Sequence, residues 1–249
     1  MQNPTNEQEK QGLIEQLFKI GAHFGFSRSR RHPSTSPFVF GYKNQTAVID
    51  LEKTIDLLNV AESFVEKIAA EGKAVLFVGN KSEARKVVAD IADKRNLPYV
   101  AERWIGGTFT NFKQIRDRIT RLLELKKQDE AGVLASRYTK KERGVIAKEV
   151  SDLERFFASL VPMEKLPGAI FVVDAKEEAI AVYEANKAGV PVIALCSSDC
   201  DIRTVQYPII GNDANRESIK FFATRIAEAY DRGRMAASAA AAAAATATA

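Results

Sequence analysis

Residues 74–79 read Ala74-Val75-Leu76-Phe77-Val78-Gly79, a short apolar run that ends at a glycine and leads into a helical pattern. Similar apolar runs follow at 169–173, 191–195 and 207–210, with a shorter one at 98–100. None of them alternates between apolar and polar residues, as a strand with one face in water would. Strands of this kind, separated by helices, predict a parallel sheet covered on both faces. We therefore predict a Rossmann-like (flavodoxin-like) three-layer α/β fold with right-handed crossovers.

The segment 111–160 interrupts this alternation. It carries no strand pattern, but apolar residues recur every three or four positions in each half, from Phe112 to Leu122 and from Ile146 to Leu160. These narrow stripes predict an antiparallel helical hairpin with a coiled-coil seam, which would project from the sheet as an arm. Basic residues are dense on its exposed faces and around its bend: Arg116, Arg118, Arg121, Lys126, Lys127, Arg137, Lys140, Lys141 and Arg143.

The remaining segments complete the predicted organisation. Helical spacing predicts helices near 6–20 and 52–70, and two short strands are expected at 38–40 and 47–49. We divide the chain into an N-terminal helix and basic loop (1–37), a Rossmann-like domain (38–110 and 161–233), the arm (111–160) and an alanine-rich tail (234–249). The tail has no apolar face to pack, so we expect it to be disordered or loosely helical.

Composition excludes several classes of protein. The 249 residues contain 36 Lys plus Arg and 32 Asp plus Glu, a formal net charge of +4, and 46% are hydrophobic, as in an ordinary globular protein. Outside the alanine tail there is no run of eighteen apolar residues, so we expect no transmembrane helix. The first residues lack a secretory pattern, and the two cysteines cannot form a disulfide framework, so we expect a cytoplasmic protein.

The ends of the predicted strands are where a Rossmann-like sheet would bind a cofactor. Gly79-Asn80-Lys81-Ser82 resembles the end of a phosphate-binding loop, but the earlier glycine is missing and Asn80 separates the glycine from the lysine. The pair Gly106-Gly107 permits either the close approach of a phosphate to the backbone or a tight turn into the arm. We predict no cofactor. An enzyme that binds a nucleotide or sugar phosphate at this crevice is the alternative.

Few residues are candidates for metal binding or for acid–base catalysis. His23 and His32 are the only histidines, and Cys196 and Cys200 lie far from them in sequence, with no second pair at zinc-ligand spacing. Asp174, at a strand end, is followed three residues later by Glu177, which predicts a helix cap instead of a catalytic carboxylate; Thr139 and Glu142 predict another cap. We predict neither catalytic residues nor a metal.

Two clusters of basic and aromatic residues remain. The stretch Ser27-Arg28-Ser29-Arg30-Arg31-His32 lies in a loop between Phe24, Phe26, Phe38 and Phe40, and Arg103, Trp104, Lys113 and Arg116 lie near the root of the arm. Arginine makes bidentate contacts with phosphate. Two such clusters favour structured RNA as the partner. The predicted RNA-contact residues are Arg28, Arg30, Arg31, Arg103, Trp104, Lys113 and Arg116.

Several motifs resemble those of the bacterial small-subunit ribosomal protein S2 family, in the family's order, over roughly residues 10–230. They are Gly21-Ala22-His23-Phe24-Gly25, Phe38-Val39-Phe40-Gly41, Ile49-Asp50-Leu51-Glu52-Lys53-Thr54, Leu76-Phe77-Val78-Gly79-Asn80-Lys81, Leu166-Pro167-Gly168-Ala169, Pro208-Ile209-Ile210-Gly211-Asn212-Asp213 and the most specific, 103–112, Arg-Trp-Ile-Gly-Gly-Thr-Phe-Thr-Asn-Phe. The basic loop departs from the family pattern at Phe26, Ser27, Arg31, His32, Ser34 and Thr35.

This resemblance implies a Rossmann-like domain with a coiled-coil arm and a structural role in the small ribosomal subunit. It implies contact with 16S ribosomal RNA between head and body, neighbouring ribosomal proteins and recruitment of the mRNA-binding protein S1, without a membrane or an autonomous homo-oligomer. The glycines Gly79, Gly106 and Gly107 would then serve turns and close packing. A third alternative treats the arm as a protein-interaction module alone.

Overall fold

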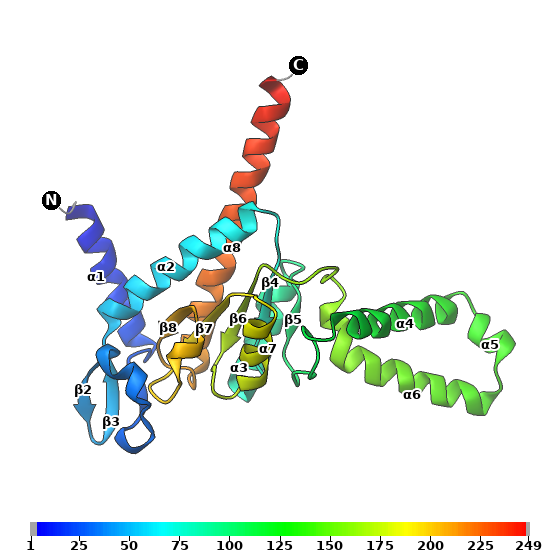
Figure 1. Cartoon of the computed structure of the whole chain (residues 1–249), viewed down its shortest axis with the longest axis horizontal. Coiled ribbons are helices and arrows are strands. Elements are labelled where there is room, and N and C mark those ends of the chain that lie inside the picture. Colours follow the sequence, from blue (N-terminus) through cyan, green and yellow to red (C-terminus); the bar gives the residue numbers. More distant parts are fainter. Residues whose placement is uncertain (1–3, 248–249) are drawn as a thin grey trace.

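The computed structural model describes residues 4–247 (Figure 1). Its helices are α1 (Pro4–Lys19), α2 (Leu51–Ala70), α3 (Ser82–Asp93), α4 (Phe112–Glu130), α5 (Val133–Arg137), α6 (Lys140–Phe157), α7 (Ala179–Lys187) and α8 (Arg216–Ala247). Its strands are β1 (Phe24–Ser27), β2 (Val39–Lys43), β3 (Thr46–Ile49), β4 (Val75–Val78), β5 (Tyr99–Val100), β6 (Ala169–Val173), β7 (Val192–Cys196) and β8 (Tyr207–Ile210).

The main sheet has five parallel strands in the order β5-β4-β6-β7-β8. With β4 counted as the first strand, this is the order 2-1-3-4-5 of the flavodoxin-like doubly wound folds. Every residue of β4, β6 and β7 is buried, because helices cover both faces of the sheet. The predicted parallel α/β fold is confirmed.

Alternate residues of each strand supply two separate cores. On β4, Phe77 packs in a core with the apolar faces of α2, α3 and α8, whereas Leu76 packs with α7 and the root of the arm on the other side. This is the period-two geometry of a strand with both faces buried. The sheet therefore forms the middle of three layers, with its polar loops confined to the two ends of the strands.

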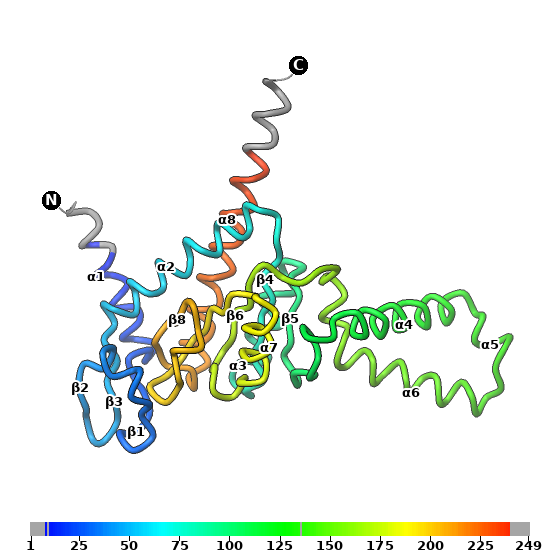
Figure 2. The backbone as a smooth tube through the Cα atoms, viewed as in Figure 1, coloured from blue at the N-terminus to red at the C-terminus, as the bar shows by residue number. Residues whose placement is uncertain are grey.

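A second, three-stranded antiparallel sheet has the order β1-β3-β2, and Figure 2 labels its three strands. Strands β2 and β3 were expected, and they turn through Asn44 and Gln45, which both have positive φ. Strand β1 lies in the stretch we predicted to be a loop. Its Gly25 allows the strand to pack against Ser198 and Ala47, since a Cβ there would lie 2.9 Å from Ser198 Oγ. That contact is long-range, so the local pattern did not reveal it.

The arm consists of α4 and α6, joined by α5, and the two helices run side by side away from the main sheet (Figures 1 and 2). The predicted apolar stripe is buried at Ile119, Leu122 and Leu153, and two ion pairs, Arg121–Glu149 (3.2 Å) and Lys126–Glu154 (2.6 Å), join the helices at the surface. The predicted cap of α6 is also present: Thr139 and Glu142 form a capping box. A coiled-coil supercoil for this pair of helices stays a prediction.

The C-terminal helix α8 crosses α2 and continues into the alanine-rich segment as far as Ala247, which corresponds to the helical alternative for that segment. Residues 1–3 and 248–249 lie outside the described part of the chain. Within 4–247, no helix combines the length and apolar composition that crossing a membrane requires.

The crossing of α2 and α8 depends on Gly233. A Cβ at this position would lie 2.3 Å from the carbonyl oxygen of Glu66 and 2.8 Å from the Cβ of Ala69, so the two backbones must separate to accept one. We expect Gly233→Ala to lower the free energy of unfolding by about 1–3 kcal/mol through overpacking. The control is Gly144→Ala, in the exposed part of α6 with open space around it, which should stabilise the helix by about 0.5–1 kcal/mol. Urea denaturation measures both, and equal effects would contradict the close crossing.

Candidate functional site

The carboxyl ends of the sheet strands, where folds of this class bind ligands, contain a buried charge network. Lys81, just before α3, places its ammonium 2.5 Å from Asp174, which follows β6, and 3.3 Å from Asp213, which follows β8. Cys200 donates its thiol hydrogen to Asp174 Oδ1 at 3.3 Å. The network thus joins four loops that are separate in sequence, through the two ion pairs of Lys81 and the hydrogen bond of Cys200.

Burial and charge set the pKa values in this network. Burial alone would raise the pKa of Asp174, but the hydrogen bond and charge of Lys81 outweigh burial and hold it below its usual range. Burial would lower the pKa of Lys81, yet Asp213 and Asp174 together raise it. Asp213 is fully buried, and burial together with the charge of Asp174 raises its pKa to about 7 despite Lys81. Lys81 therefore stays protonated and compensates the carboxylates around it.

Residues 26–35 cover the carboxyl ends of the strands. The ring of Phe26 lies 5.9 Å from Lys81 Nζ, and the backbone N–H of Phe26 donates to Ser198 Oγ at 2.8 Å. His32 N–H and Thr35 Oγ1 both donate to the carbonyl oxygen of Ser198, at 2.9 and 2.8 Å. The place that a nucleotide or sugar phosphate would need is occupied by the chain's own side chains.

The loop Gly79-Asn80-Lys81-Ser82 binds a carboxylate of the same chain. Asn80 donates its backbone N–H and its side-chain amide to the two oxygens of Glu178, both at 2.8 Å. Gly79 packs closely on α3, where a Cβ would lie 3.0 Å from Ala84 and 3.1 Å from Val88. Burial raises the pKa of Glu178 to about 7. The amides that resemble a phosphate-binding loop therefore serve an internal glutamate.

The Gly106-Gly107 loop is satisfied in the same way. Glu184 on α7 accepts from the backbone N–H groups of Gly107 at 2.6 Å and Phe109 at 3.1 Å. Gly107 has a φ of +93°, the left-handed region that favours glycine. Of the two alternatives for Gly106-Gly107, the tight turn into the arm describes this loop correctly. The sequence pattern did not reveal Glu178 or Glu184 as partners of these loops, because neither has a spacing relation to the glycines.

Asp174 caps a turn, whereas the sequence predicted that it would cap a helix. Its Oδ1 accepts from the backbone N–H groups of Lys176 at 2.9 Å and Glu177 at 3.2 Å. The residues that follow form a turn, and α7 begins only at Ala179, so Asp174 caps this turn and not the first turn of the helix. Its ion pair with Lys81 was not expected.

One group of potential metal ligands lies within this network. Among residues 4–247, only Asp174, Cys200 and Asp213 form a group of three or more close potential ligands, and both histidines lie outside it. Lys81 occupies the cation position beside the two carboxylates. The adjacent Cys196 thiol, and then burial, raise the pKa of the Cys200 thiol far above its ordinary value, which disfavours the thiolate that would bind a metal.

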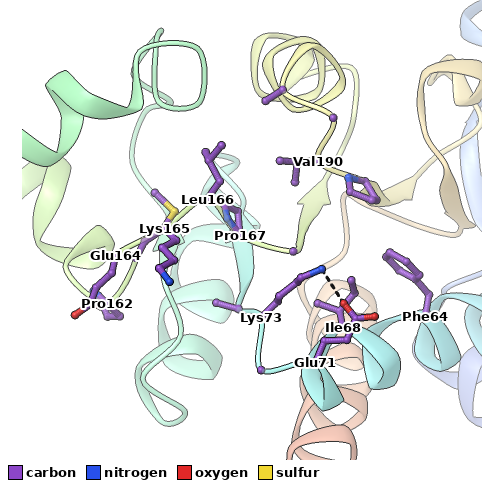
Figure 3. Close-up of a pocket in the computed structure, with 17 residues that line it drawn as sticks. Phe64, Ile68, Glu71, Lys73, Pro162, Glu164, Lys165, Leu166, Pro167 and Val190 are labelled. Carbon is purple, nitrogen blue, oxygen red and sulfur yellow. Dashed lines mark ion pairs between the residues drawn. The ribbon is translucent and has the colours of Figure 1, made fainter.

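A hollow of about 880 Å³ lies at the opposite, amino-terminal ends of the strands (Figure 3). Its wall includes Lys73, close before β4, and Val190, close before β7, together with apolar residues such as Leu166. The charged groups that Figure 3 joins, Lys73 and Glu71, pair with each other at 2.7 Å. This hollow offers no converging set of free polar groups that would bind a small substrate.

The basic loop, residues 27–32, leaves the crevice and displays its arginines outward. Arg28 and Arg30 are exposed and Arg31 is half-buried, and none of the three pairs with a described carboxylate. Tyr42 on β2 positions two of them. Arg31 donates to the Tyr42 hydroxyl at 3.0 Å, and the Arg28 guanidinium lies 5.4 Å from the ring centroid.

The second cluster lies at the root of the arm. Arg103 and Lys113 are exposed, whereas Arg116 is half-buried and donates to the carbonyl oxygen of Met163 at 3.1 Å. Trp104 is only 6% exposed and packs edge-on against Phe109, which leaves it a packing role and no free ring face. The structure does not bring the two clusters together: the basic loop lies beyond β8, and the root of the arm lies beside β5 at the other edge of the sheet (Figure 1).

Comparison with known proteins adds an independent observation. The family model described as "Ribosomal protein S2" matches residues 17–233. "Small ribosomal subunit protein uS2" of Coprothermobacter proteolyticus is 40% identical over 221 residues, which cover 89% of this chain and 82% of that protein. The protein of the same description from Syntrophobacter fumaroxidans is 39% identical over 221 residues, covering 89% and 80%.

Removing Lys81 tests the buried charge network. In Lys81→Met, Asp174 and Asp213 would remain buried without their common counter-ion, and we expect the free energy of unfolding to fall by about 3–5 kcal/mol. The control is Lys73→Met, which breaks an exposed ion pair with Glu71 and should cost no more than about 1 kcal/mol. Urea unfolding of both variants provides the comparison. A loss below about 1 kcal/mol in Lys81→Met would show that the network does not hold the loops together.

Glu178 predicts a pH dependence of stability. Its pKa is raised to about 7 in the folded protein from an ordinary 4.5, so the folded state binds this proton more tightly than the unfolded state. Its contribution to stability is complete below the unfolded pKa and is lost as the pH rises through about 7. In Glu178→Gln that loss is absent, so relative to wild type the variant should gain about 2–3 kcal/mol between about pH 5 and pH 8.

The exposed Glu124 on the arm helix α4 supplies the control for this measurement. Glu124→Gln removes the same charge far from Glu178, so its stability relative to wild type should stay nearly constant over the same pH range. Denaturant titrations at several pH values give both curves. Parallel curves for Glu178→Gln and wild type would show that Glu178 is ionised in the folded protein throughout that range.

Proposed function

The chain belongs to the ribosomal protein S2 family, and we propose that it binds 16S ribosomal RNA through the basic loop and the exposed basic residues at the root of the arm. It is a structural component of the small ribosomal subunit and not an enzyme. The observation that carries the RNA proposal is the state of Arg28 and Arg30, exposed cations without a described carboxylate partner on a loop whose backbone is anchored to Ser198. An anchored backbone suits phosphate contacts by these side chains because little backbone conformational entropy is lost on binding.

The location of the two clusters supports a contact with folded RNA at more than one point. One lies beyond β8 and the other beside β5, so an RNA that touches both must span the main sheet. Arg103, Lys113 and Arg116 would contact phosphates at the second point, with Trp104 packed behind them. The crevice alternative has little support, since Lys81, Phe26, Glu178 and Glu184 fill the sites that a nucleotide or sugar phosphate would use.

The finer expectations from the family resemblance belong to the same proposal. They place the protein in the cytoplasm on the ribosome, between the head and body of the small subunit, beside other small-subunit proteins. They also assign it a part in recruiting protein S1 and so in positioning mRNA. The arm, with its own apolar seam and exposed charged faces, is the part of the chain that we propose reaches neighbouring proteins.

Replacing Arg28, Arg30 and Arg31 together by Ala tests the basic loop. We expect weaker association with small subunits and a shallower salt dependence, with the log–log slope reduced by roughly 0.7–0.9 for each phosphate that the loop no longer neutralises. Co-sedimentation with small subunits over a series of salt concentrations measures both quantities. Thermal denaturation should show that the sheet still folds, because the main sheet packs without these side chains.

A variant with the same charge change elsewhere separates a local contact from an effect of net charge. The control replaces Lys67, Lys94 and Lys220 by Ala, because these three exposed lysines lie outside the arm and both basic clusters. The proposal is contradicted if the loop variant joins small subunits as tightly as wild type at every salt concentration. Equal losses in both variants would mean that overall charge, and not the basic loop, determines binding.

A further inference from the structure

The outer side of the three-stranded sheet presents an aromatic surface beside the basic loop. Phe40 on β2 is 83% exposed and Tyr42, two residues later, is 39% exposed. Val39 pairs with Ile49 and Gly41 with Val48, so Phe40 is the additional residue of a β-bulge. Bulges redirect a side chain and are common next to functional sites. The bulge explains why the large apolar ring of Phe40 is exposed to solvent.

Two arginines of the basic loop contact Tyr42, one member of this aromatic pair. Arg28 lies over the Tyr42 ring at 5.4 Å, and Arg31 donates to the Tyr42 hydroxyl at 3.0 Å. Lys43, the next residue on β2, is also exposed. The Arg28 guanidinium lies over the Tyr42 ring, and the exposed Phe40 is two residues before Tyr42 on β2, so flat groups and cations share one short stretch of the surface. We define Phe40, Tyr42, Arg28 and Arg31 as the stacking surface.

The chemistry of these groups selects one form of RNA. Base faces are covered by their neighbours in a double helix, and paired RNA offers phosphates, 2′-hydroxyls and base edges. An exposed ring can stack only on a base that is unpaired, and each stacked base contributes appreciably to affinity. Arginine planes stack on bases and also bind phosphate.

We propose that the stacking surface binds an unpaired nucleotide of the RNA, with its base on Phe40 and its phosphates on Arg28 and Arg31. This inference rests on the proposed function and specifies the form of RNA that the basic loop contacts. A protein strand added to the open edge of β2 is the other occupant that this surface could have. Such a strand would be held by backbone hydrogen bonds and would not need the arginines, so the Phe40 ring and the cations together favour RNA.

The test uses two RNA hairpins of nearly equal length and charge, each closed by the same non-nucleotide linker so that no loop base is unpaired. One has a fully paired stem, and the other has a single-nucleotide bulge carrying the fluorescent base 2-aminopurine. Wild type should bind the bulged hairpin more tightly and change its fluorescence. Phe40→Ala should lose roughly tenfold in affinity for the bulged hairpin and little for the paired one, as expected for one stacked base. Phe40→Tyr should restore binding, and Phe40→Leu should not, because leucine is apolar but cannot stack.

Tyr138→Ala is the matched control, since it removes a ring that is 40% exposed at the bend of the arm, away from the basic loop. It should bind both hairpins as wild type does. If wild type binds neither hairpin, the proposed function fails and the inference fails with it. If wild type binds both equally and Phe40→Ala changes nothing, RNA binding stands and the stacking inference is overturned. If Phe40→Ala binds both hairpins as wild type does but is incorporated less into small subunits, the stacking surface binds a protein. That result would also overturn the stacking inference.

Discussion

The ammonium group of Lys81 lies against two buried carboxylates, Asp174 and Asp213, which follow different strands of the main sheet. Removing charges from water costs several kcal/mol each, so such a group is stable only while its partners remain in place. Each loop at this end of the sheet is therefore held by the others. Because Phe26 of the N-terminal loop packs over Lys81, the position of the basic loop also depends on this network.

The same arrangement explains how a fold used by many cofactor-binding enzymes serves a structural role here. The loops keep their glycines, but their backbone N–H groups donate to carboxylates of the chain itself, Glu178 and Glu184, which take the position of an anionic ligand. The crevice is thereby converted from a binding site into part of the core. The proposed function then lies on the outer surface of the molecule, where arginines and aromatic rings are exposed. This agrees with the principle that the fold of a protein does not determine its function.

Individual residues show where reading the sequence succeeded and where it failed. Leu76 and Phe77 identified a doubly covered strand because burial on both faces leaves a continuous apolar run, and Thr139 identified a cap because its partner is three residues away. Trp104 looked like part of a surface cluster beside Arg103, but it is buried against Phe109. Strand β1 was missed, since its pairing with β3 and its contact with Ser198 join segments far apart in the chain.

The sequence by itself determined the parallel sheet, its covering helices, the helical segments of the arm and the basic character of two surface segments, because periodicity, caps and composition act over a few residues. Only the tertiary structure decided that Lys81 balances Asp174 and Asp213, that Glu178 and Glu184 satisfy the glycine loops, and that Arg28 lies over Tyr42. Those contacts form between loops that the strand order brings together. A carboxylate has no local pattern that reveals which distant amide or ammonium group it will meet.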